Sequence, residues 1–457
     1  MHSGLSEKRS DRLAKFLFVV SCLGGTWISG IAVAHYELFP YTQIRFAVGQ
    51  ARSALGVLGE TVGTRRPLYY YEMQNIPDDA VIHAAEKAAP GNTLISGIST
   101  EDQQVVRIID EAGDILHEWR IDWFDIWPEP AHLDEDLVPK SRPGASIHGI
   151  VFMPNGDLVF NFENLGLVRL DYCGAVVWRL PYRTHHSIQL DENGNLWVPG
   201  KVRHLDPSPR FPNHKPPFDD FLLLEVSPDG DVLTEISVFE LLIDNGLSGL
   251  LYLSTVNNWG TVVSGDTLHL NDLDIFPSTI SSDVFSPGDF MISLRNINAI
   301  FVFDKESRRV KFQSIGNVIR QHDPDFVDGN KIAVLDNHNL SSAVTEYRRA
   351  EEGLASRIVL LDVSSGELSV VFSGSEETPF FTDIMGKQQW LDNGNILIAE
   401  ARHGRAFEVT RDGAVVWEYY NRAGPGLLGL IDDAQRLPLE FDREMLDQFA
   451  LACQADL

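Results

Sequence analysis

The sequence contains little cysteine and no paired cysteine motif. Of its 457 residues only three are cysteine, at positions 22, 173 and 453. No two of them form a Cys-x-x-Cys pattern, so the sequence excludes a thiolate metal site and a small disulfide-rich scaffold. A bridge between Cys173 and Cys453 stays open, because nothing in the spacing argues for or against it.

Basic residues are also scarce. The chain carries 37 Lys and Arg against 65 Asp and Glu, a formal net charge of −28. General nucleic-acid binding needs a basic face, so this balance excludes it. The same charge repels an anionic substrate at long range unless local cations offset it. Most of the acidity is typical of a solvated, soluble surface.

Several motifs that would identify common enzyme and metal-binding classes are missing. The sequence has no EF-hand loop, no Walker loop, no Gly-x-Ser-x-Gly and no His-Glu-x-x-His. Calcium switches, P-loop nucleotide enzymes, α/β-hydrolases and zinc proteases therefore have no support.

One long hydrophobic run stands near the N-terminus. Residues 1–15 form a basic tail, and residues 16–36 carry no titratable side chain that is basic or acidic except His35. About 20 apolar residues span a bilayer as a helix. The basic flank predicts a cytoplasmic N-terminus, so we expect a transmembrane signal anchor with the remaining chain periplasmic or lumenal. A cleaved signal peptide is the alternative, because Ala32-Val-Ala34 fits a cleavage site.

Two similar stretches predict hairpins. Residues 146–160 and 186–198 each place a histidine, His148 or His186, seven residues before an Asn-Gly pair flanked by apolar residues. Asn-Gly in this setting favours a two-residue type I′ turn, which needs positive φ at both central positions. A histidine at the same place in a recurring hairpin indicates a site.

The hairpin belongs to a larger repeat. A repeat unit of three or four predicted strands occurs six times, with copies that begin near Gly91, Gly156, Gly194, Asp289, Gly329 and Gly394. Few helical runs separate these strands. Such repeats predict an all-β fold, a six-bladed β-propeller, with the N-terminal transmembrane helix and a C-terminal helix added to it.

The same pattern predicts the domain boundaries. After the tail and anchor we expect a connector at 37–90, the propeller at 91–425 and a C-terminal helical extension at 426–457. Long excursions, such as 199–220, are expected to be loops between strands.

Four histidines share one place in the repeat: His148, His186, His269 and His322. The innermost strand of each blade lines a central channel, so we expect these side chains to converge at one mouth of it. The sixth copy has Gly386 at this place, followed by Lys387. Imidazole serves as a general acid or base, a nucleophile or a metal ligand.

Three segments carry a resemblance to a known family. They are Asp266-Thr-Leu-His-Leu-Asn271 with the later Ile292-Ser-Leu-Arg295, Gln321-His-Asp323 with Leu335-Asp-Asn337, and the last-repeat run Leu391-Asp-Asn-Gly-Asn395. Over roughly residues 91–420 the chain resembles the arylsulfotransferase family, whose propellers move a sulfuryl group between phenols.

The resemblance implies a ping-pong transfer through a covalent sulfohistidine, with an aryl sulfate or phenol as partner and no metal or nucleotide cofactor. By motif, His269 and His322 are the expected catalytic histidines, and Asn271 is expected to orient the first of them. Other expected substrate-binding residues are His148, His186, Arg295 and Lys387.

The sequence departs from the family at two places. The family's nucleophilic histidine lies in the last blade, where this chain has Gly386 and Lys387, and its arginine after Asp-Asn-Gly has no counterpart. Arg295, Arg348 and Arg357 are candidates to replace that arginine, and His148 or His186 to replace the nucleophile. Lys387 is a candidate to bind a sulfate or phosphate group as a point charge. The alternative is a solvated lysine.

Three functions therefore stay open. The first is sulfuryl transfer between phenolic compounds. The second is a non-catalytic envelope propeller that binds a small anion or a partner protein. The third is a metal site built by the converging histidines.

Overall fold

The computed structural model describes residues 3–36, 69–73, 75–77, 80–253, 262–339 and 355–455. The chain divides into two units, residues 1–68 and 69–457. In the first unit, α1 (Ser3–His35) includes the stretch Ala14–Val33, whose mean hydropathy of 1.9 and length of 20 residues suffice to cross a membrane. These properties fit both a membrane anchor and a signal sequence. Residues 37–68 of the expected connector lie outside the described residues.

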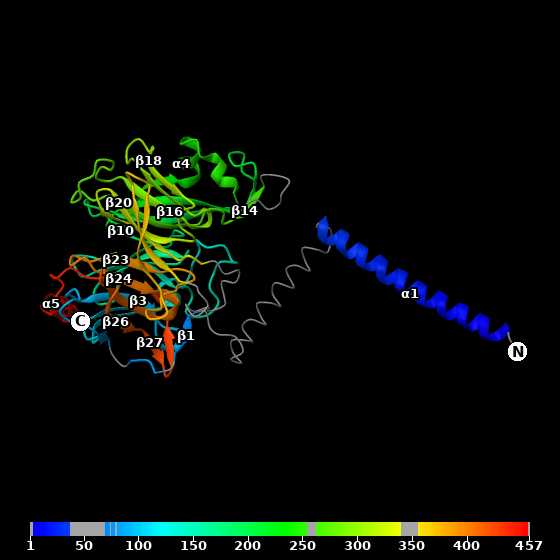
Figure 1. The fold of residues 1–457 in the computed structure, drawn as a ribbon, viewed down its shortest axis with the longest axis horizontal. Helices are drawn as coiled ribbons and strands as arrows, with labels where there is room; N and C mark the ends of the chain where they lie inside the picture. Colours follow the sequence, from blue (N-terminus) through cyan, green and yellow to red (C-terminus); the bar gives the residue numbers. More distant parts are fainter. Residues whose placement is uncertain are drawn as a thin grey trace. The chain divides into compact units, whose positions relative to one another are not determined.

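The second unit confirms the expected all-β class. Its described residues form mostly antiparallel sheets with few helices, among them α3 (Trp123–Ile126), α4 (Val238–Asp244) and α5 (Arg443–Ala455) (Figure 1). Six sheets have four or five strands. A smaller one joins β1 (Tyr70–Glu72), β28 (Leu427–Gly429) and β27 (Arg422–Gly424).

The first three of the six larger sheets are built mainly from the first half of the chain, with β29 added from its end. The first sheet joins β29 (Ile431–Arg436), β3 (Thr93–Ile98), β4 (Gln104–Ile109) and β5 (Ile115–Ile121). The second joins β6 (Ile147–Phe152), β7 (Leu158–Phe162), β8 (Gly166–Leu170) and β9 (Val176–Leu180). The third joins β10 (Gln189–Leu190), β11 (Leu196–His204), β12 (His214–Val226) and β13 (Val232–Ser237), and β14 (Val263–Gly265) pairs with β12.

The other three follow in chain order. The fourth sheet joins β15 (Leu270–Ile275), β16 (Phe290–Leu294), β17 (Ala299–Phe303) and β18 (Val310–Ile315). The fifth joins β19 (His322–Asp328), β20 (Lys331–Asp336), β21 (Arg357–Asp362) and β22 (Leu368–Ser373). The sixth joins β23 (Lys387–Trp390), β24 (Ile396–Glu400), β25 (Arg405–Val409), β26 (Val415–Tyr420) and β2 (Val81–Ile82).

Burial differs across each sheet in a way that the sequence explains. The second strand of a sheet is mostly apolar and buried, as in β7, where four of the five residues are apolar and all five are buried. The last strand, such as β9, leaves Val176 and Val177 exposed. A strand covered on both faces becomes a continuous apolar run, whereas an edge strand keeps one face toward solvent.

The expected hairpins are present, but their turn type differs from the prediction. At Asn155-Gly156 only the glycine has a positive φ, +90°. Gly156 N donates to Met153 O at 2.9 Å, and Met153 N donates to Asp157 O at 2.8 Å. This is a type I turn followed by a left-handed glycine, the common alternative for slightly longer hairpin loops.

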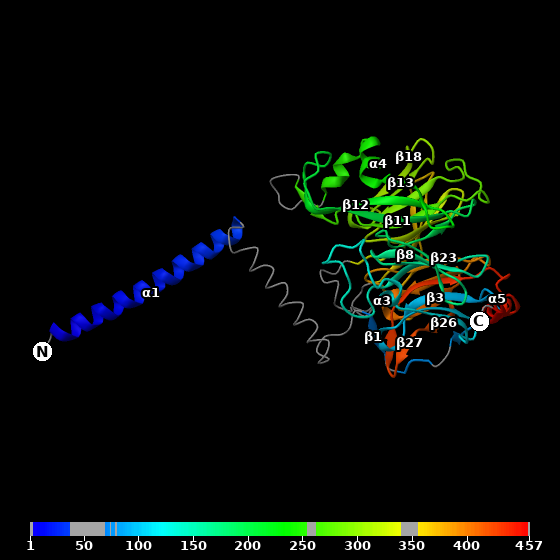
Figure 2. The same cartoon turned by 180° about the vertical axis from the view of Figure 1, so that it is seen from behind.

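The first strand of each sheet lies at the centre of the unit. β6 contacts β29, β15 contacts both β11 and β19, and β23 contacts both β19 and β29. Strand β29 pairs with β3, from Ile431 opposite Gly97 to Arg436 opposite Thr93, so the end of the chain completes the sheet that its beginning starts (Figure 2). The segment 426–457, expected to be helical, thus holds a strand of the first sheet before α5.

A disulfide fastens α5 to the second sheet. Cys173, in the turn between β8 and β9, is bonded to Cys453 in α5, across 280 residues of sequence. The helix also packs the ring of Phe449 at 5.4 Å from that of Tyr172, and Leu446 is buried beside it. The bridge that the sequence left open is therefore part of the structure.

Replacing Cys173 by serine is expected to lower the free energy of unfolding by about 2–5 kcal/mol, because the unfolded chain loses a long-range crosslink. Urea unfolding of the full chain measures this loss. The exposed Cys22 gives the matched control, Cys22→Ser in the full chain, with no expected change. Two free thiols at 173 and 453 in the non-reduced protein would contradict the bridge.

Candidate functional site

The structure brings the four repeat histidines together. The ring centroid of His186 lies 4.0 Å from that of His148, 5.3 Å from that of His269 and 6.2 Å from that of His322. His148 lies in β6 and His322 begins β19, while His186 and His269 precede β10 and β15. We call these four residues the histidine cluster. His185 adjoins it, with its Nδ1 2.8 Å from Nδ1 of His186.

Local backbone geometry turns these side chains inward. His186 and His269 have positive φ values of +58° and +53°. Pairing is irregular near the beginning of β6 and β19, and β15 has a similar irregularity between Leu270 and Asp272. Bulges of this kind re-aim a side chain and are common beside active sites. Left-handed backbone at non-glycine residues is strained by roughly 1–3 kcal/mol, so the surrounding packing must hold it.

The hydrogen bonds of His322 define its tautomer. Asn337 Nδ2 donates to Thr382 O at 3.0 Å and to Met385 O at 2.8 Å, so its Oδ1 is the acceptor that faces His322 Nδ1 at 2.6 Å. Nδ1 of His322 therefore carries the hydrogen, and Nε2 carries a lone pair. Within the described residues Nε2 is buried without a hydrogen-bond partner. Burial, then the charge of Arg295, holds the pKa of His322 well below its usual value, so the ring stays neutral.

His269 is held by a carboxylate. Its Nδ1 is paired with Asp266 Oδ2, and its buried Nε2 has no partner among the described residues. Burial lowers the pKa of His269 to about 4, although Asp266 opposes this shift. The carboxylate orients the ring and stabilises it if Nε2 takes up a proton. Asp266 stands three residues before His269 in the sequence, a signal that the motif offered and that sequence reasoning did not use.

Two cations lie around the histidine cluster. Burial, then the charge of Arg320, lowers the pKa of Arg295 to about 10, and the charge of Arg295 in turn lowers the pKa of His148 and His322. Lys201 is 7% exposed, with Nζ 5.0 Å from the ring centroid of Phe221. Local cations of this kind offset the acidic net charge and attract an anion.

Lys201 was missed because residues 199–220 were expected to form a loop. Residues 199–204 instead belong to β11 and residues 214–220 to β12, and Lys201 pairs with Phe221. Of the other arginines considered, Arg357 pairs with the buried Asp336, and Arg348 lies outside the described residues.

Asn271 bonds to the neighbouring sheet. Its Nδ2 donates to Gln321 O at 2.7 Å, the carbonyl directly before His322, and its Oδ1 has no partner in the described part of the chain. Asn271 thus ties β15 to the beginning of β19, whereas the side chain that holds His269 is Asp266.

The structure gives a physical reason for the glycine in the sixth repeat. Gly386 has a φ of +103°, and a Cβ there would lie 3.0 Å from Leu335 Cδ1 and 3.1 Å from Thr382 Cγ2. A side chain at this position would meet both backbone strain and close neighbours. Glycine is therefore the residue that fits the backbone and the neighbours at this position.

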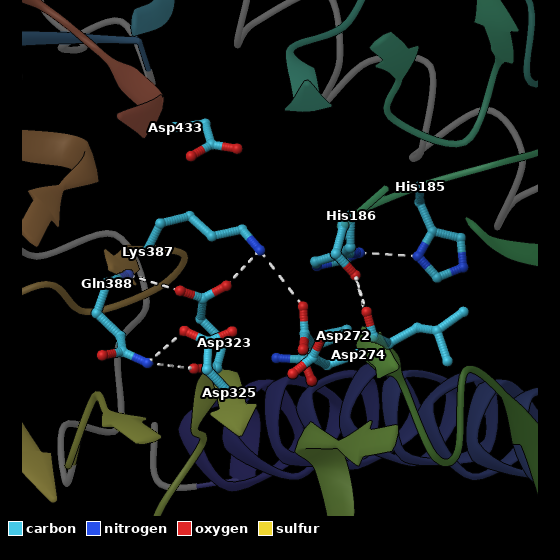
Figure 3. A network of polar contacts seen from close by, with 12 residues as sticks. His185, His186, Asp272, Asp274, Asp323, Asp325, Lys387, Gln388 and Asp433 are labelled. Carbon is cyan, nitrogen blue, oxygen red and sulfur yellow. Dashed lines mark hydrogen bonds and ion pairs between the residues drawn. The ribbon is translucent and has the colours of Figure 1, made fainter. Parts of the chain in front are cut away.

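Lys387 forms a bridge between three sheets. From β23 its Nζ reaches Asp272 Oδ1 of β15 at 3.3 Å and also pairs with Asp323 Oδ1 of β19 (Figure 3). Gln388 N donates to the other oxygen of Asp323 at 2.6 Å. Burial alone would lower the pKa of Lys387, but Asp323 and Asp272 outweigh burial and hold it well above its usual value. Lys387 is thus a paired cation whose side chain is only 14% exposed.

Beyond this bridge lies an acidic cavity of about 510 Å³. It is lined by Asp274, Asp325 and Asp433 together with Gln388 and Trp390. Burial raises the pKa of Asp274 to about 7 and that of Asp433 to about 6. No group of three or more His, Cys, Asp or Glu in the described ranges has the geometry to hold a metal ion.

Replacing Lys387 by methionine is expected to cost about 3–5 kcal/mol of unfolding free energy at pH 8, because two buried carboxylates lose their cation. Without Lys387 the pKa of Asp272, already raised to about 6 by burial, rises further above its unfolded value. The folded variant then binds extra protons at low pH, so its stability decreases as pH rises from about 4 through that raised pKa.

Urea unfolding at pH 5 and pH 8 measures this difference. The control is Lys331→Met, because Lys331 forms an exposed pair with Asp328 and its loss is expected to change stability by no more than about 0.5 kcal/mol. Equal losses for the Lys387 variant at both pH values would contradict a buried carboxylate bridge.

The chain is similar to several solved structures and to one protein family. Among solved structures, a protein of unknown function from Bacteroides caccae aligns with a TM-score of 0.45 and 12% identity, over 76% of this chain and 98% of that chain. A streptogramin B lyase aligns at 0.35 and 12%, over 78% and 89%. TolB from Acinetobacter baumannii aligns at 0.41 and 11%, over 75% and 66%. No curated protein matches. Residues 149–422 match the family described as Arylsulfotransferase (ASST).

Proposed function

The chain belongs to the arylsulfotransferase (ASST) family, and from that premise we propose that its histidine cluster moves a sulfuryl group from an aryl sulfate to a phenol. The resemblance seen in the sequence is thereby confirmed at the level of the family. The observation that carries the proposal is the unpaired lone pair on Nε2 of His322, fixed by Asn337 and kept neutral by burial.

The proposed scaffold is a six-bladed β-propeller. The six larger sheets are its blades, their first strands line the channel, and β29 closes the ring by completing the first blade. Closure of this kind leaves only short, protected edges. The propeller then runs from β3 to β29, and α5 with its disulfide forms the C-terminal extension.

His322 is the proposed nucleophile. Nε2 attacks the sulfur, the S–O bond to the aryl group breaks, and the sulfuryl group stays on His322 until an acceptor phenol removes it. His322 takes this role because the family's last-blade position is Gly386, where a side chain does not fit. The hydrogen bond from Nδ1 to Asn337 stabilises the imidazolium that forms.

The remaining residues bind the sulfonate oxygens. Arg295 and Lys201 supply positive charge, and His148 and His186 line the same cluster. When an anion enters, the His269–Asp266 pair takes up a proton at Nε2 and donates it as a hydrogen bond to a sulfonate oxygen. Preorganised donors that face developing charge supply a large part of a catalytic rate enhancement. Lys387 holds the strands that carry the site together through its ion pairs with Asp272 and Asp323.

The proposed location is extracytoplasmic. The apolar helix α1 acts as a signal anchor, which places the propeller in the periplasm or an equivalent lumen. The Cys173–Cys453 disulfide supports this location, because such bonds persist in oxidising compartments and are rare in the cytosol.

His322→Ala is expected to lower transfer from 4-nitrophenyl sulfate to phenol by at least about 10³-fold, since removal of a catalytic nucleophile costs several orders of magnitude. Release of 4-nitrophenol and formation of phenyl sulfate measure the transfer. The control is His83→Ala at the exposed His83, which pairs with Glu418 away from the histidine cluster, and it is expected to retain activity.

Two outcomes separate the alternatives. Full activity in the His322 variant would assign the nucleophile to another residue. A wild-type protein that binds sulfate without transferring any sulfuryl group between phenols would support the non-catalytic anion-binding propeller instead.

A further inference from the structure

Asp432 stands at the level of the histidine cluster in the first sheet. The Lys387 bridge aligns Asp272 of β15, Asp323 of β19 and Lys387 of β23, and the charge of Lys387 also acts on Asp433 of β29. One residue earlier on these strands stand Asn271, His322, Gly386 and Asp432. Asp432 thus occupies in β29 the place that His322 occupies in β19.

A bulge turns Asp432 out of the strand ladder. Ile431 pairs with Gly97 and Asp433 pairs with Ser96, so Asp432 has no partner in β3. The same irregularity in β15 leaves Asn271 between Leu270 and Asp272. A bulge next to an active site re-aims a side chain, and the same bulge occurs at both residues.

The carboxyl group of Asp432 has no protein partner. Its side chain is 2% exposed, and neither of its two oxygens accepts or donates a hydrogen bond within the described part of the chain. Buried polar groups are almost always paired, and each exception calls for an explanation. A bound ligand that supplies the missing partner explains this one.

The charges around Asp432 belong to the candidate site. Burial, then the charges of Glu163 and Asp433, raises the pKa of Asp432 well above its usual value, which favours the protonated carboxyl group. Burial also raises the pKa of Glu163, while Lys201 and Arg295, the cations beside the histidine cluster, oppose it. Asp432 is therefore a buried acid that shares a charged neighbour, Glu163, with Lys201 and Arg295.

We propose that Asp432 is a catalytic residue of this reaction, the general acid for the leaving phenolate and the general base for the incoming phenol. The inference rests on the proposed sulfuryl transfer and adds the proton path that the histidine cluster lacks. His322 serves as nucleophile and His269 is paired with Asp266, whereas Asp432 is free to exchange its proton with the substrate oxygen.

The proton balances over the two halves of the reaction. In the first half, the electron pair of the broken S–O bond goes to the aryl oxygen, which takes the proton of the Asp432 carboxyl group. The products are a phenol, sulfo-His322 and the Asp432 carboxylate. In the second half, the acceptor phenol gives its proton to Asp432, its oxygen bonds to sulfur, and the electron pair of the N–S bond returns to Nε2.

Asp432→Asn in the full chain tests the proposal with donors of different leaving groups. With 4-nitrophenyl sulfate, whose phenolate leaves without a proton, the variant is expected to release one equivalent of 4-nitrophenol in a burst. Steady-state transfer to phenol should decrease by about 10²–10⁴-fold, the usual contribution of general acid–base catalysis. With phenyl sulfate, whose phenolate needs a proton, the burst itself should slow by a similar factor.

The matched control is Asp325→Asn, a carboxylate of β19 that accepts from Gln388 Nε2 at 2.6 Å and lines the acidic cavity. It is expected to keep the wild-type dependence on the leaving group. Unchanged turnover with both donors in Asp432→Asn would overturn the proposal, and so would an equal loss of the burst rate with both donors, which indicates a structural role. Absence of burst and turnover in the wild type would instead overturn the proposed function itself.

Discussion

The ammonium group of Lys387 is the interaction on which the centre of the molecule depends. It lies in β23 and pairs with carboxylates from β15 and β19, so one charge joins three inner strands that the sequence keeps far apart. Asp272 and Asp323 are buried, and carboxylates without a cation in such a place would be strongly destabilising. The residues one step earlier on these strands include Asn271 and His322, so the bridge also fixes the spacing of the site.

Two kinds of charge lie on opposite sides of Lys387. On one side of Lys387 lie neutral, buried histidines with Arg295 and Lys201, a setting that attracts an anion. On the other side lies the acidic cavity, where Asp274 and the other carboxylates would repel it. A protein with a net charge of −28 can therefore hold a sulfonate at the histidine level, because the local field there differs from the field of the whole molecule.

Sequence reasoning found the strands and histidines whose pattern is local. Asn-Gly pairs mark the hairpins, and the fixed distance from His148 to Asn155 marks the repeat, because turn chemistry depends on neighbouring residues. It missed β29 and the end of β11, since a strand that faces a polar channel loses the apolar alternation that identifies strands. Ile431-Asp-Asp-Ala-Gln-Arg436 is such a segment, and Asp432 was lost with it. Asn337, the partner of His322, belongs to the motif Leu335-Asp-Asn337. Only the fold shows that its amide sets the tautomer of His322.

The central claim is that His322 carries the sulfuryl group, and locating that group on the chain tests it most directly. The protein is treated with 4-nitrophenyl sulfate in the absence of an acceptor, quenched at alkaline pH, digested and analysed by mass spectrometry. The account predicts one added sulfuryl mass on the peptide that contains His322, removed again by phenol. An adduct on a different histidine, or continued transfer with no histidine adduct at all, would contradict it.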